Sequence, residues 1–329
     1  MHDHAPPHRP PLPHRPWLRR DTPILWRTAR TIQVGDADRT VLISDLPRDV
    51  LLWARSLRGD RTLDECLAAC PDVDSGRTML QALRMAGALD DAARTSHTTA
   101  LLPRALRDRD HRHAAAARLA YDDERAHLAV DARALARIGI FGQGPLAQAI
   151  RISLRQSGIG HVIDMTPPSS AARIGRLQAA EIDLFVLAHT WHPDSFDDAG
   201  CLALDVPHLP AAAWGTRGIV GPLVVPGRTP CLRCGLLRAQ DGDSAFATLH
   251  LQRSHAKPDI MAIDTALALA VAAHTAIAVC AWVESLGEEQ SASGGSHRLR
   301  LMMPRGTVTY EKFPAHPLCG CGWRDEQAA

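Results

Sequence analysis

Four cysteines in two close pairs are the residues of this chain whose types and spacing point most directly to chemistry. Cys231 and Cys234 form a Cys-x-x-Cys pair, and Cys319 and Cys321 form a Cys-x-Cys pair near the C-terminus. Each short spacing lets two sulfurs reach one ion, and the flanking prolines and glycines favour tight turns. Two buried pairs of small side chains, or a disulfide, are the alternatives. We predict a structural zinc ion held by all four thiolates, which would join the middle of the chain to its end.

A second group of residues is typical of nucleotide-binding folds. A short buried strand is predicted at 137–141, and Gly142-Gln-Gly144 follows it and opens a helix. The next predicted strand ends in Asp164, about twenty residues after the first glycine, as in dinucleotide-binding units. Pro145 removes one amide donor from the turn that would hold a phosphate. The pattern predicts a Rossmann-like unit, and leaves nucleotide binding as a separate question.

Three polar residues follow another predicted buried strand, 181–188. His189, His192 and Asp194 stand just past its end, where α/β proteins usually carry their active sites. No serine or cysteine nucleophile accompanies them in a recognisable turn, and ordinary loop polar groups are the alternative. Their role stays open. Further on, a strand is predicted at 219–225, and a hairpin at 298–313 leads to the second cysteine pair.

The region 22–92 is predicted to be a separate winged-helix-like module. Alternating apolar residues indicate strands at 25–28, 31–34 and 40–44, and helices are expected to begin at Pro47, at Thr62 and at Asp74 or Ser75. The third helix carries only Arg77 and Arg84 as cations, which is too few for a nucleic-acid surface. A strand edge beside an apolar helix suits the binding of an extended peptide by strand addition.

The remaining regions carry no recognisable chemistry. Residues 1–21 are rich in proline and histidine, and we expect a disordered tail. Residues 93–136 are rich in arginine, aspartate and alanine, and are predicted to be a solvated connector to a domain that spans 137–329. Cys66 and Cys70, one helical turn apart, are predicted to be core residues.

Composition limits the function classes. The chain has 329 residues, 46% hydrophobic residues and a formal net charge of +1, so bulk electrostatics indicate neither nucleic acid nor an anionic membrane as a partner. Eight cysteines without a recognisable secretory signal predict a cytoplasmic location. Asp264 and His274 interrupt the alanine-rich stretch 260–286, which we expect to be a buried helix and not a membrane span.

The order of these features resembles the ThiF-like leader-peptide-binding proteins of azol(in)e (TOMM) peptide biosynthesis. The most specific matching residues are Gly-Pro-Leu-Val-Val-Pro-Gly-Arg-Thr-Pro-Cys-Leu-Arg-Cys at 221–234 and His-Pro-Leu-Cys-Gly-Cys at 316–321. The N-terminal module is a looser match, and the resemblance extends over about 22–323. It implies the α/β fold of ubiquitin-activating-type adenylating enzymes, with a structural zinc ion on the four cysteines.

This resemblance also implies a function in the biosynthesis of ribosomally made natural products (RiPPs, bacteriocins). Such proteins bind the leader of a precursor peptide and present the rest to a YcaO-type cyclodehydratase, which uses ATP to form azolines. A homodimer is left open. By the resemblance, the leader groove is formed by a strand and a helix, with the residues Thr40, Val41, Leu42, Ile43, Ser44, Arg77, Leu80, Gln81 and Arg84.

The chain departs from the adenylating members of that family at the nucleotide site. Those members follow the strand-two acid with an Asn-Leu-x-Arg-Gln-type segment, whereas Met-Thr-Pro-Pro-Ser-Ser follows Asp164 here. The nearest basic residues, Arg151 and Arg173, are not placed by a motif, and Cys201 and Cys280 look like core residues. We therefore expect a non-catalytic subunit, in which Gly142, Gly144 and Asp164 form a vestigial nucleotide site.

Two rival functions remain open. An active ThiF-type adenylyltransferase would activate a carboxylate with ATP and magnesium, and an arginine placed over the triphosphate would support it. An NAD-dependent oxidoreductase would use the glycine turn and Asp164, but no acid/base pair for hydride transfer stands out in the sequence.

Overall fold

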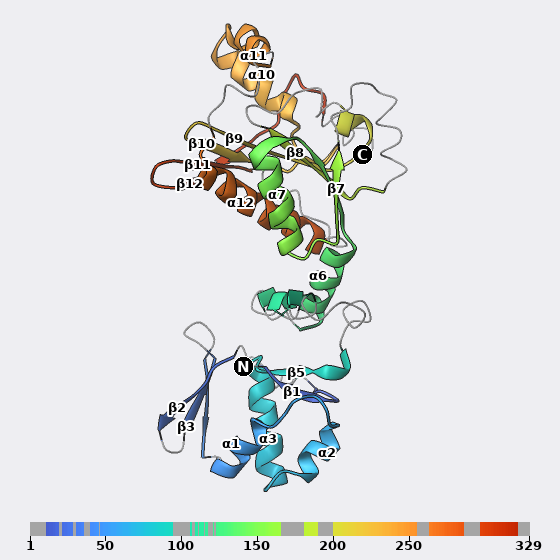
Figure 1. The fold of residues 1–329 in the computed structure, drawn as a ribbon, viewed down its shortest axis with the longest axis vertical. Coiled ribbons are helices and arrows are strands. Elements are labelled where there is room, and N and C mark those ends of the chain that lie inside the picture. The colour runs from blue at the N-terminus through green and yellow to red at the C-terminus, as the bar shows by residue number, and fades with distance from the viewer. Residues whose placement is uncertain are drawn as a thin grey trace, which may run out of the picture. The chain divides into compact units, whose positions relative to one another are not determined.

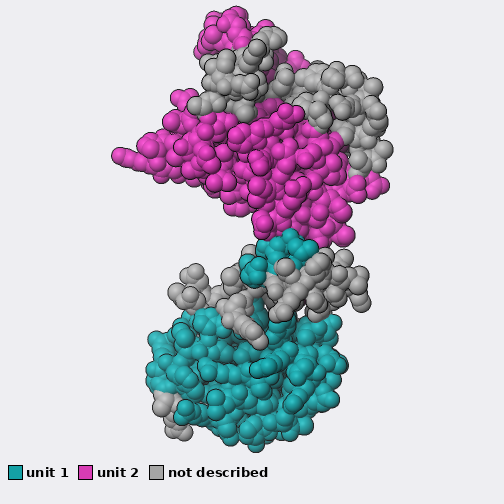
Figure 2. Space-filling view, in the orientation of Figure 1, with its two compact units in different colours: residues 1–126 teal, residues 127–329 magenta. Residues whose placement is uncertain are grey.

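The chain forms two compact units, residues 1–126 and 127–329 (Figure 2). The computed structural model describes 11–19, 22–28, 31–35, 40–45, 47–94, 106, 109–110, 112–114, 116–117, 121, 123–165, 181–189, 200–254, 263–285 and 297–321.

In the part of it that the structure describes, unit 1 contains a three-stranded antiparallel sheet and several helices (Figure 1). The strand order is β2-β3-β4, so β4 forms one edge of the sheet and β2 the other. These elements overlap the strands and helices that the sequence predicts. Their bounds are β2 Ile24–Thr28, β3 Thr31–Val34, β4 Val41–Ser44, α1 Arg48–Ala54, α2 Leu63–Ala68 and α3 Val73–Met85.

Local hydrogen bonds explain where the helices of unit 1 begin. Thr62 caps α2 in a capping box with Glu65, in which each side chain accepts a bond from the other residue's backbone N–H. The start predicted for α3, at Asp74 or Ser75, is wrong. Asp72 is the cap, because its backbone is extended and its carboxylate accepts a bond from the N–H of Asp74 at 3.3 Å.

The predicted tail, 1–21, is wrong for residues 11–19, and residues 1–10 and 20–21 lie outside the described residues. β1 (Pro16–Leu18) pairs antiparallel with β5 (Leu89–Asp91). The Asp91 carboxylate also accepts bonds from the backbone N–H groups of His14 and Arg15, both at 2.9 Å. The partner strand lies more than seventy residues away along the chain, so no local pattern could reveal this pairing.

The core of unit 1 lies between α1, α2, α3 and the sheet. Met79, Leu80 and Leu83 on α3 are fully buried in it. Cys66 and Cys70 are buried as well, as predicted, and burial is the main cause that raises the pKa of each thiol. The two sulfurs therefore behave as small apolar core groups.

Unit 2 is built on a seven-stranded sheet in the order β12-β11-β10-β9-β8-β6-β7 (Figure 1). The strands β9, β8, β6 and β7 are parallel, and the other three pair antiparallel. The strands are β6 Arg137–Phe141, β7 His161–Met165, β8 Leu184–His189, β9 His208–Trp214, β10 Arg217–Val220, β11 His297–Met302 and β12 Thr307–Lys312.

Helices cover both faces of this sheet. Figure 1 shows α7 and α12 below it and α10 and α11 above it. The core on the α7 and α12 side includes Ile138, Ile140 and Leu299, and the core on the other side includes Phe141 and Phe185. The helices are α6 Asp123–Leu135, α7 Gly144–Gln156, α10 Leu232–Gly242, α11 Phe246–Ser254 and α12 Thr265–Glu284.

Two segments of the second half differ from their predictions. The predicted strand 219–225 is shorter and ends at Val220, and Pro222, which has no backbone N–H to donate to a sheet, follows soon after. The predicted connector, 93–136, ends in a regular helix, α6, which spans Asp123–Leu135. Its buried side chains are mainly alanines, which leave little apolar contrast in the sequence.

The predicted buried helix is α12, whose start is capped by Asp264, with a bond from the N–H of Leu267 at 3.0 Å. Among the described helices it is the one with the length and apolar composition to cross a membrane. Half of its 18-residue apolar segment is buried, and the helix packs against α7, β9 and β10. These contacts are those of a core helix.

Candidate functional site

The four cysteines of the two pairs come together on the sheet face that α10 covers. Cys231 precedes α10 and Cys234 lies in its first turn, while Cys319 and Cys321 lie in the loop after β12. The sulfurs of Cys231 and Cys319 are 3.4 Å apart, as are those of Cys234 and Cys321, and all four lie within 4.8 Å of one another. The structure therefore confirms that the two pairs share one site.

The spacing of the sulfurs fits a metal ion better than a disulfide. A disulfide would place two sulfurs about 2.05 Å apart, whereas four sulfurs at about 2.3 Å from one zinc ion lie about 3.8 Å from each other. The observed separations, 3.4 Å within two of the sulfur pairs and no more than 4.8 Å between any two sulfurs, fit this value. Four thiolates also complete a tetrahedral shell and leave no open position, which is the arrangement of a structural site.

Protons and a metal ion compete for these sulfurs. Burial, together with the thiols of Cys321 and Cys319, raises the pKa of Cys234 to about 12. Burial also acts to raise the pKa of Cys321, but the backbone N–H of Cys231 and the neighbouring thiols hold that pKa below its ordinary value. Without a cation, Cys234 would therefore keep its proton at neutral pH. A divalent ion would displace that proton and favour the thiolate form of its sulfur ligands.

His316 connects the terminal loop to α10 beside the cysteines, a role that the sequence analysis did not assign. Its Nδ1 accepts a hydrogen bond from the N–H of Leu318 at 3.1 Å. The ring hydrogen therefore lies on Nε2, which donates a hydrogen bond to the Asp241 carboxylate at 2.9 Å. Its carbonyl oxygen accepts the N–H of Cys319 at 3.0 Å. The signal was available in the matching segment 316–321, where His316 begins the motif.

The glycine turn joins β6 to α7, as predicted. Gly142 has a φ of 138° and Gly144 a φ of 82°, both in the region that favours glycine. A Cβ on Gly142 would lie 2.1 Å from the carbonyl oxygen of Ala188, whereas a Cβ on Gly144 would meet nothing within 4 Å. Gly142 is therefore required by packing as well as by backbone conformation, and Gly144 by conformation alone.

We expect this difference to appear in stability. Gly142→Ala should lower the free energy of unfolding of unit 2 by about 2–4 kcal/mol, because strain and a backbone clash add together. The matched change, Gly144→Ala, should cost about 1 kcal/mol from strain alone. Urea titrations of the two variants would measure both values. Equal costs would contradict the close contact between Gly142 and Ala188.

Asp164, near the end of β7, already has a cationic partner within the chain. Asp164 forms an ion pair with Nε of Arg151 on α7, and Nη2 of the same guanidinium donates to the carbonyl oxygen of Gly142 at 2.9 Å. The Asp164 side chain is 62% exposed, so the pair lies at the surface of the turn. Arg151, which no motif placed in the sequence, thus links both parts of the predicted nucleotide site. Arg173 lies outside the described residues.

The group at the end of β8 is only partly described. His189 is the last residue of β8 and is half-buried. His192 and Asp194 lie outside the described residues.

The predicted peptide groove lies along β4 and α3, which pack against each other in unit 1. Thr40 and Ser44 are exposed and Leu42 is 51% exposed, while Val41 is half-buried and Ile43 points into the core. On α3, Arg77 is exposed and Gln81 and Arg84 are half-buried. The prediction for Leu80 needs correction: it is fully buried in the core of unit 1, so it cannot contact a peptide at the surface.

The opposite edge strand also carries exposed apolar residues, which the sequence analysis did not single out. Leu25 and Trp26 on β2 are 54% and 44% exposed. Unit 1 therefore offers two sheet edges, β2 and β4. In the described part of the chain, α3 packs against the β4 edge.

Comparisons with known proteins agree with this fold. No model of a known protein family matches the chain, and no curated protein matches its sequence. Among solved structures, Escherichia coli MccB with MccA-N7isoASN has a TM-score of 0.58 and 15% identity, with 93% of this chain and 99% of that chain covered.

Two heterocyclase structures are similar to the chain as well. A heterocyclase in complex with substrate and cofactor has a TM-score of 0.59 and 16% identity, and the match covers 93% of this chain and 39% of that one. The heterocyclase TruD has a TM-score of 0.62 and 12% identity, with 95% and 44% covered. The chain thus shares its fold with MccB over nearly the whole of both proteins, and with less than half of each heterocyclase.

Proposed function

We propose that this chain captures the leader of a ribosomally made precursor peptide and presents the rest of that peptide to a YcaO-type cyclodehydratase. The observation that carries the proposal is that the fold is similar to two groups of solved structures. One set of similar structures is MccB, several of them with the peptide MccA, and the other set is heterocyclases, one of them with substrate. This chain matches less than half of each heterocyclase chain, as we would expect if it were a separate subunit that recruits the peptide and left the cyclodehydratase to another protein.

The β4 edge supports peptide capture by unit 1. An edge strand offers unpaired backbone N–H and C=O groups, to which an extended leader can add as a further strand. Leu42 is exposed on β4, and Arg77 is exposed on α3, so apolar and acidic side chains of a leader would both find partners. A labelled leader peptide titrated with the full chain, and followed by fluorescence anisotropy, tests this binding.

Zinc would serve as a scaffold in this proposal. Cys231, Cys234, Cys319 and Cys321 would hold it, and it would fix the terminal loop against α10. With four sulfur ligands, the ion has no position left for water or substrate. A reducing cytoplasm, where thiols persist and remain available for metal ions, is the location that we propose for the protein.

We further propose that the chain has no adenylating activity of its own. Stabilising a reacting triphosphate requires cations directed at the phosphates. Arg151 stands at the turn, but its charge is compensated by Asp164 and its guanidinium is bonded to Gly142. Pro145 also removes one amide donor from the start of α7.

The placement of Arg151 is the one observation that favours the second candidate, an active adenylyltransferase. We expect pyrophosphate–ATP exchange with the purified chain, its peptide and magnesium to stay at background level. Exchange well above background that is lost in both Asp164→Ala and Arg151→Met would establish the adenylating function instead. Weak nucleotide binding without exchange agrees with the proposal, since Asp164 could still bind a ribose hydroxyl.

A further inference from the structure

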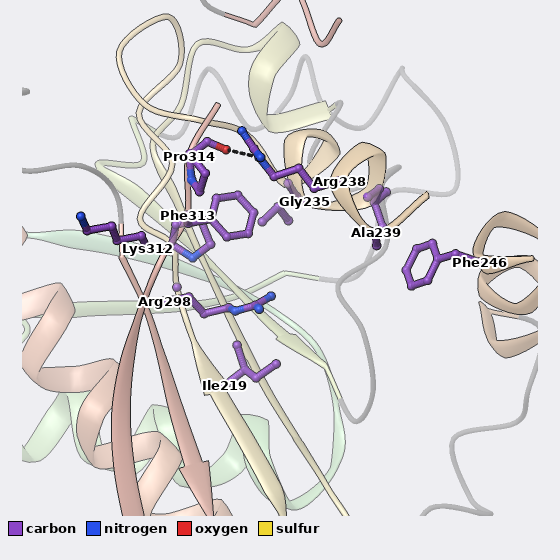
Figure 3. Close-up of a pocket in the computed structure, with 13 residues that line it drawn as sticks. Ile219, Gly235, Arg238, Ala239, Phe246, Arg298, Lys312, Phe313 and Pro314 are labelled. Carbon is purple, nitrogen blue, oxygen red and sulfur yellow. Dashed lines mark hydrogen bonds between the residues drawn. The ribbon is translucent and has the colours of Figure 1, made fainter. Parts of the chain in front are cut away.

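A cavity of about 390 Å³ lies in unit 2 between α10 and the strands β10, β11 and β12 (Figure 3). Its volume is within the range of pockets that hold small organic ligands. Most of its wall is apolar, with Ile219, Leu232, Leu236, Phe246 and Phe313 among the lining residues. None of the residues that line it is acidic.

The strand alternation of β11 places one cation in this cavity. Leu299 and Leu301 face the core beneath α12, so Arg298 faces the opposite side of the sheet. Figure 3 shows its guanidinium reaching from the strand toward the side of the cavity where Ala239 and Phe246 lie. It lies 5.6 Å from the centre of the Phe313 ring.

Arg298 keeps a hydrogen-bond donor to spare. Its Nε is buried and has no hydrogen-bond partner in the part of the chain that the structure describes. One terminal nitrogen donates to Glu311 at 2.9 Å. A buried N–H without a partner is costly, so a small rotation of the guanidinium that brought this N–H to a ligand oxygen would add to the affinity.

The charges around the cavity leave an excess of positive charge. Arg298 and Arg300 share the single carboxylate of Glu311, at 2.9 and 2.5 Å. Arg238, at the rim, donates only to the main-chain oxygens of Pro314 and Ala315 in its described contacts. The ammonium of Lys312 is directed away from Phe246 in Figure 3, so a ligand in the cavity would meet Arg298 on the strand, with Arg238 as a second cation at the rim.

We propose that this cavity binds a small organic acid, with its apolar body among the apolar walls and its carboxylate on Arg298. A planar carboxylate matches the fork of a guanidinium, and a bond between two charged groups is stronger than a neutral one. Three strands separate β11 from β6, which places the cavity roughly 19 Å from β6 at about 4.8 Å per strand. The site is therefore distinct from the glycine turn, and it does not depend on the proposed leader binding.

The test uses 3-phenylpropionate as the probe and the full zinc-loaded chain, with binding measured by ligand-observed NMR titration. We expect 3-phenylpropionate to bind, 3-phenylpropionamide to bind about tenfold more weakly because it lacks the charge, and inorganic phosphate not to displace the acid. Arg298→Met should weaken the binding of the acid about tenfold. Ala239→Leu should abolish binding by filling the cavity while it leaves Arg298 in place.

Arg305→Met is the matched control, because Arg305 is exposed in the turn between β11 and β12 and does not line the cavity. It should bind the acid as the wild type does. Glu311 keeps Arg300 as a partner in Arg298→Met, so that variant should remain folded, and thermal melting checks this. Equal binding of acid and amide, unchanged binding in Arg298→Met or Ala239→Leu, or no binding by the wild type would overturn the proposal.

Discussion

Cys231→Ser is expected to remove stoichiometric zinc from the protein and to lower the melting temperature of unit 2 by at least about 10 °C. The four sulfurs lie within 4.8 Å of one another, so the loss of one leaves a three-sulfur shell that holds the ion far less tightly. Zinc would also join α10 to the loop after β12, whose paired cysteines are 88 and 87 residues apart in the sequence. The metal's binding free energy would then be part of the folding free energy. Metal analysis and calorimetry measure the two effects.

Cys201→Ser is the matched control for this prediction. Cys201 is buried in the same hydrophobic cluster as the four cysteines, but it is not a member of the four-sulfur group. This variant should keep one zinc ion and lose only the modest stability that a buried hydroxyl costs. Wild-type protein that carries no zinc after careful purification, or Cys231→Ser protein that still carries one, would contradict the assignment.

Val41→Pro is expected to weaken leader binding at least about tenfold, the second large effect. Val41 pairs with Val34 at one end of β4, the edge next to α3. Proline removes a backbone donor and distorts the strand to which the leader would add. Anisotropy titrations with a labelled leader peptide measure the change, and circular dichroism shows whether unit 1 remains folded.

The other edge of the same sheet provides a control for that experiment. Leu25→Pro places the same residue in β2, opposite Gln33 of the shared neighbour β3, so its local cost to the sheet should be similar. Leader affinity should then stay near that of the wild type. If Leu25→Pro weakened binding and Val41→Pro did not, the peptide would add to β2, beside the exposed Leu25 and Trp26.

The cysteine site could be predicted because its spacing is local. Each pair fixes two ligands within four residues, and only the meeting of the two pairs depends on the fold. The same holds for the glycine turn, whose strand–turn–helix context is contiguous in the sequence. The strand β1 could not be predicted, since its partner β5 lies far along the chain. The helix cap at Asp72 was missed because three acceptors, Asp72, Asp74 and Ser75, compete for the same helix start.

Contacts between distant elements account for the remaining differences. Arg151 acquires its place only when α7 lies beside the end of β7, so its sequence neighbours give no sign of the pair with Asp164. Leu80 has the spacing of a groove residue, but tertiary packing turns it into the core. The cavity at Arg298 combines residues of α10, α11 and three strands, and no short motif could indicate it.

Reconstituted ring formation tests the central claim most directly. The measurement combines the precursor peptide, ATP, magnesium and the cognate YcaO-type enzyme, with and without this chain, and mass spectrometry counts the water molecules lost from the peptide. We predict rapid loss of water only when this chain is present and the leader is attached, and a strongly reduced rate with Val41→Pro. Equal ring formation without the chain, or on a peptide that lacks its leader, would contradict the account.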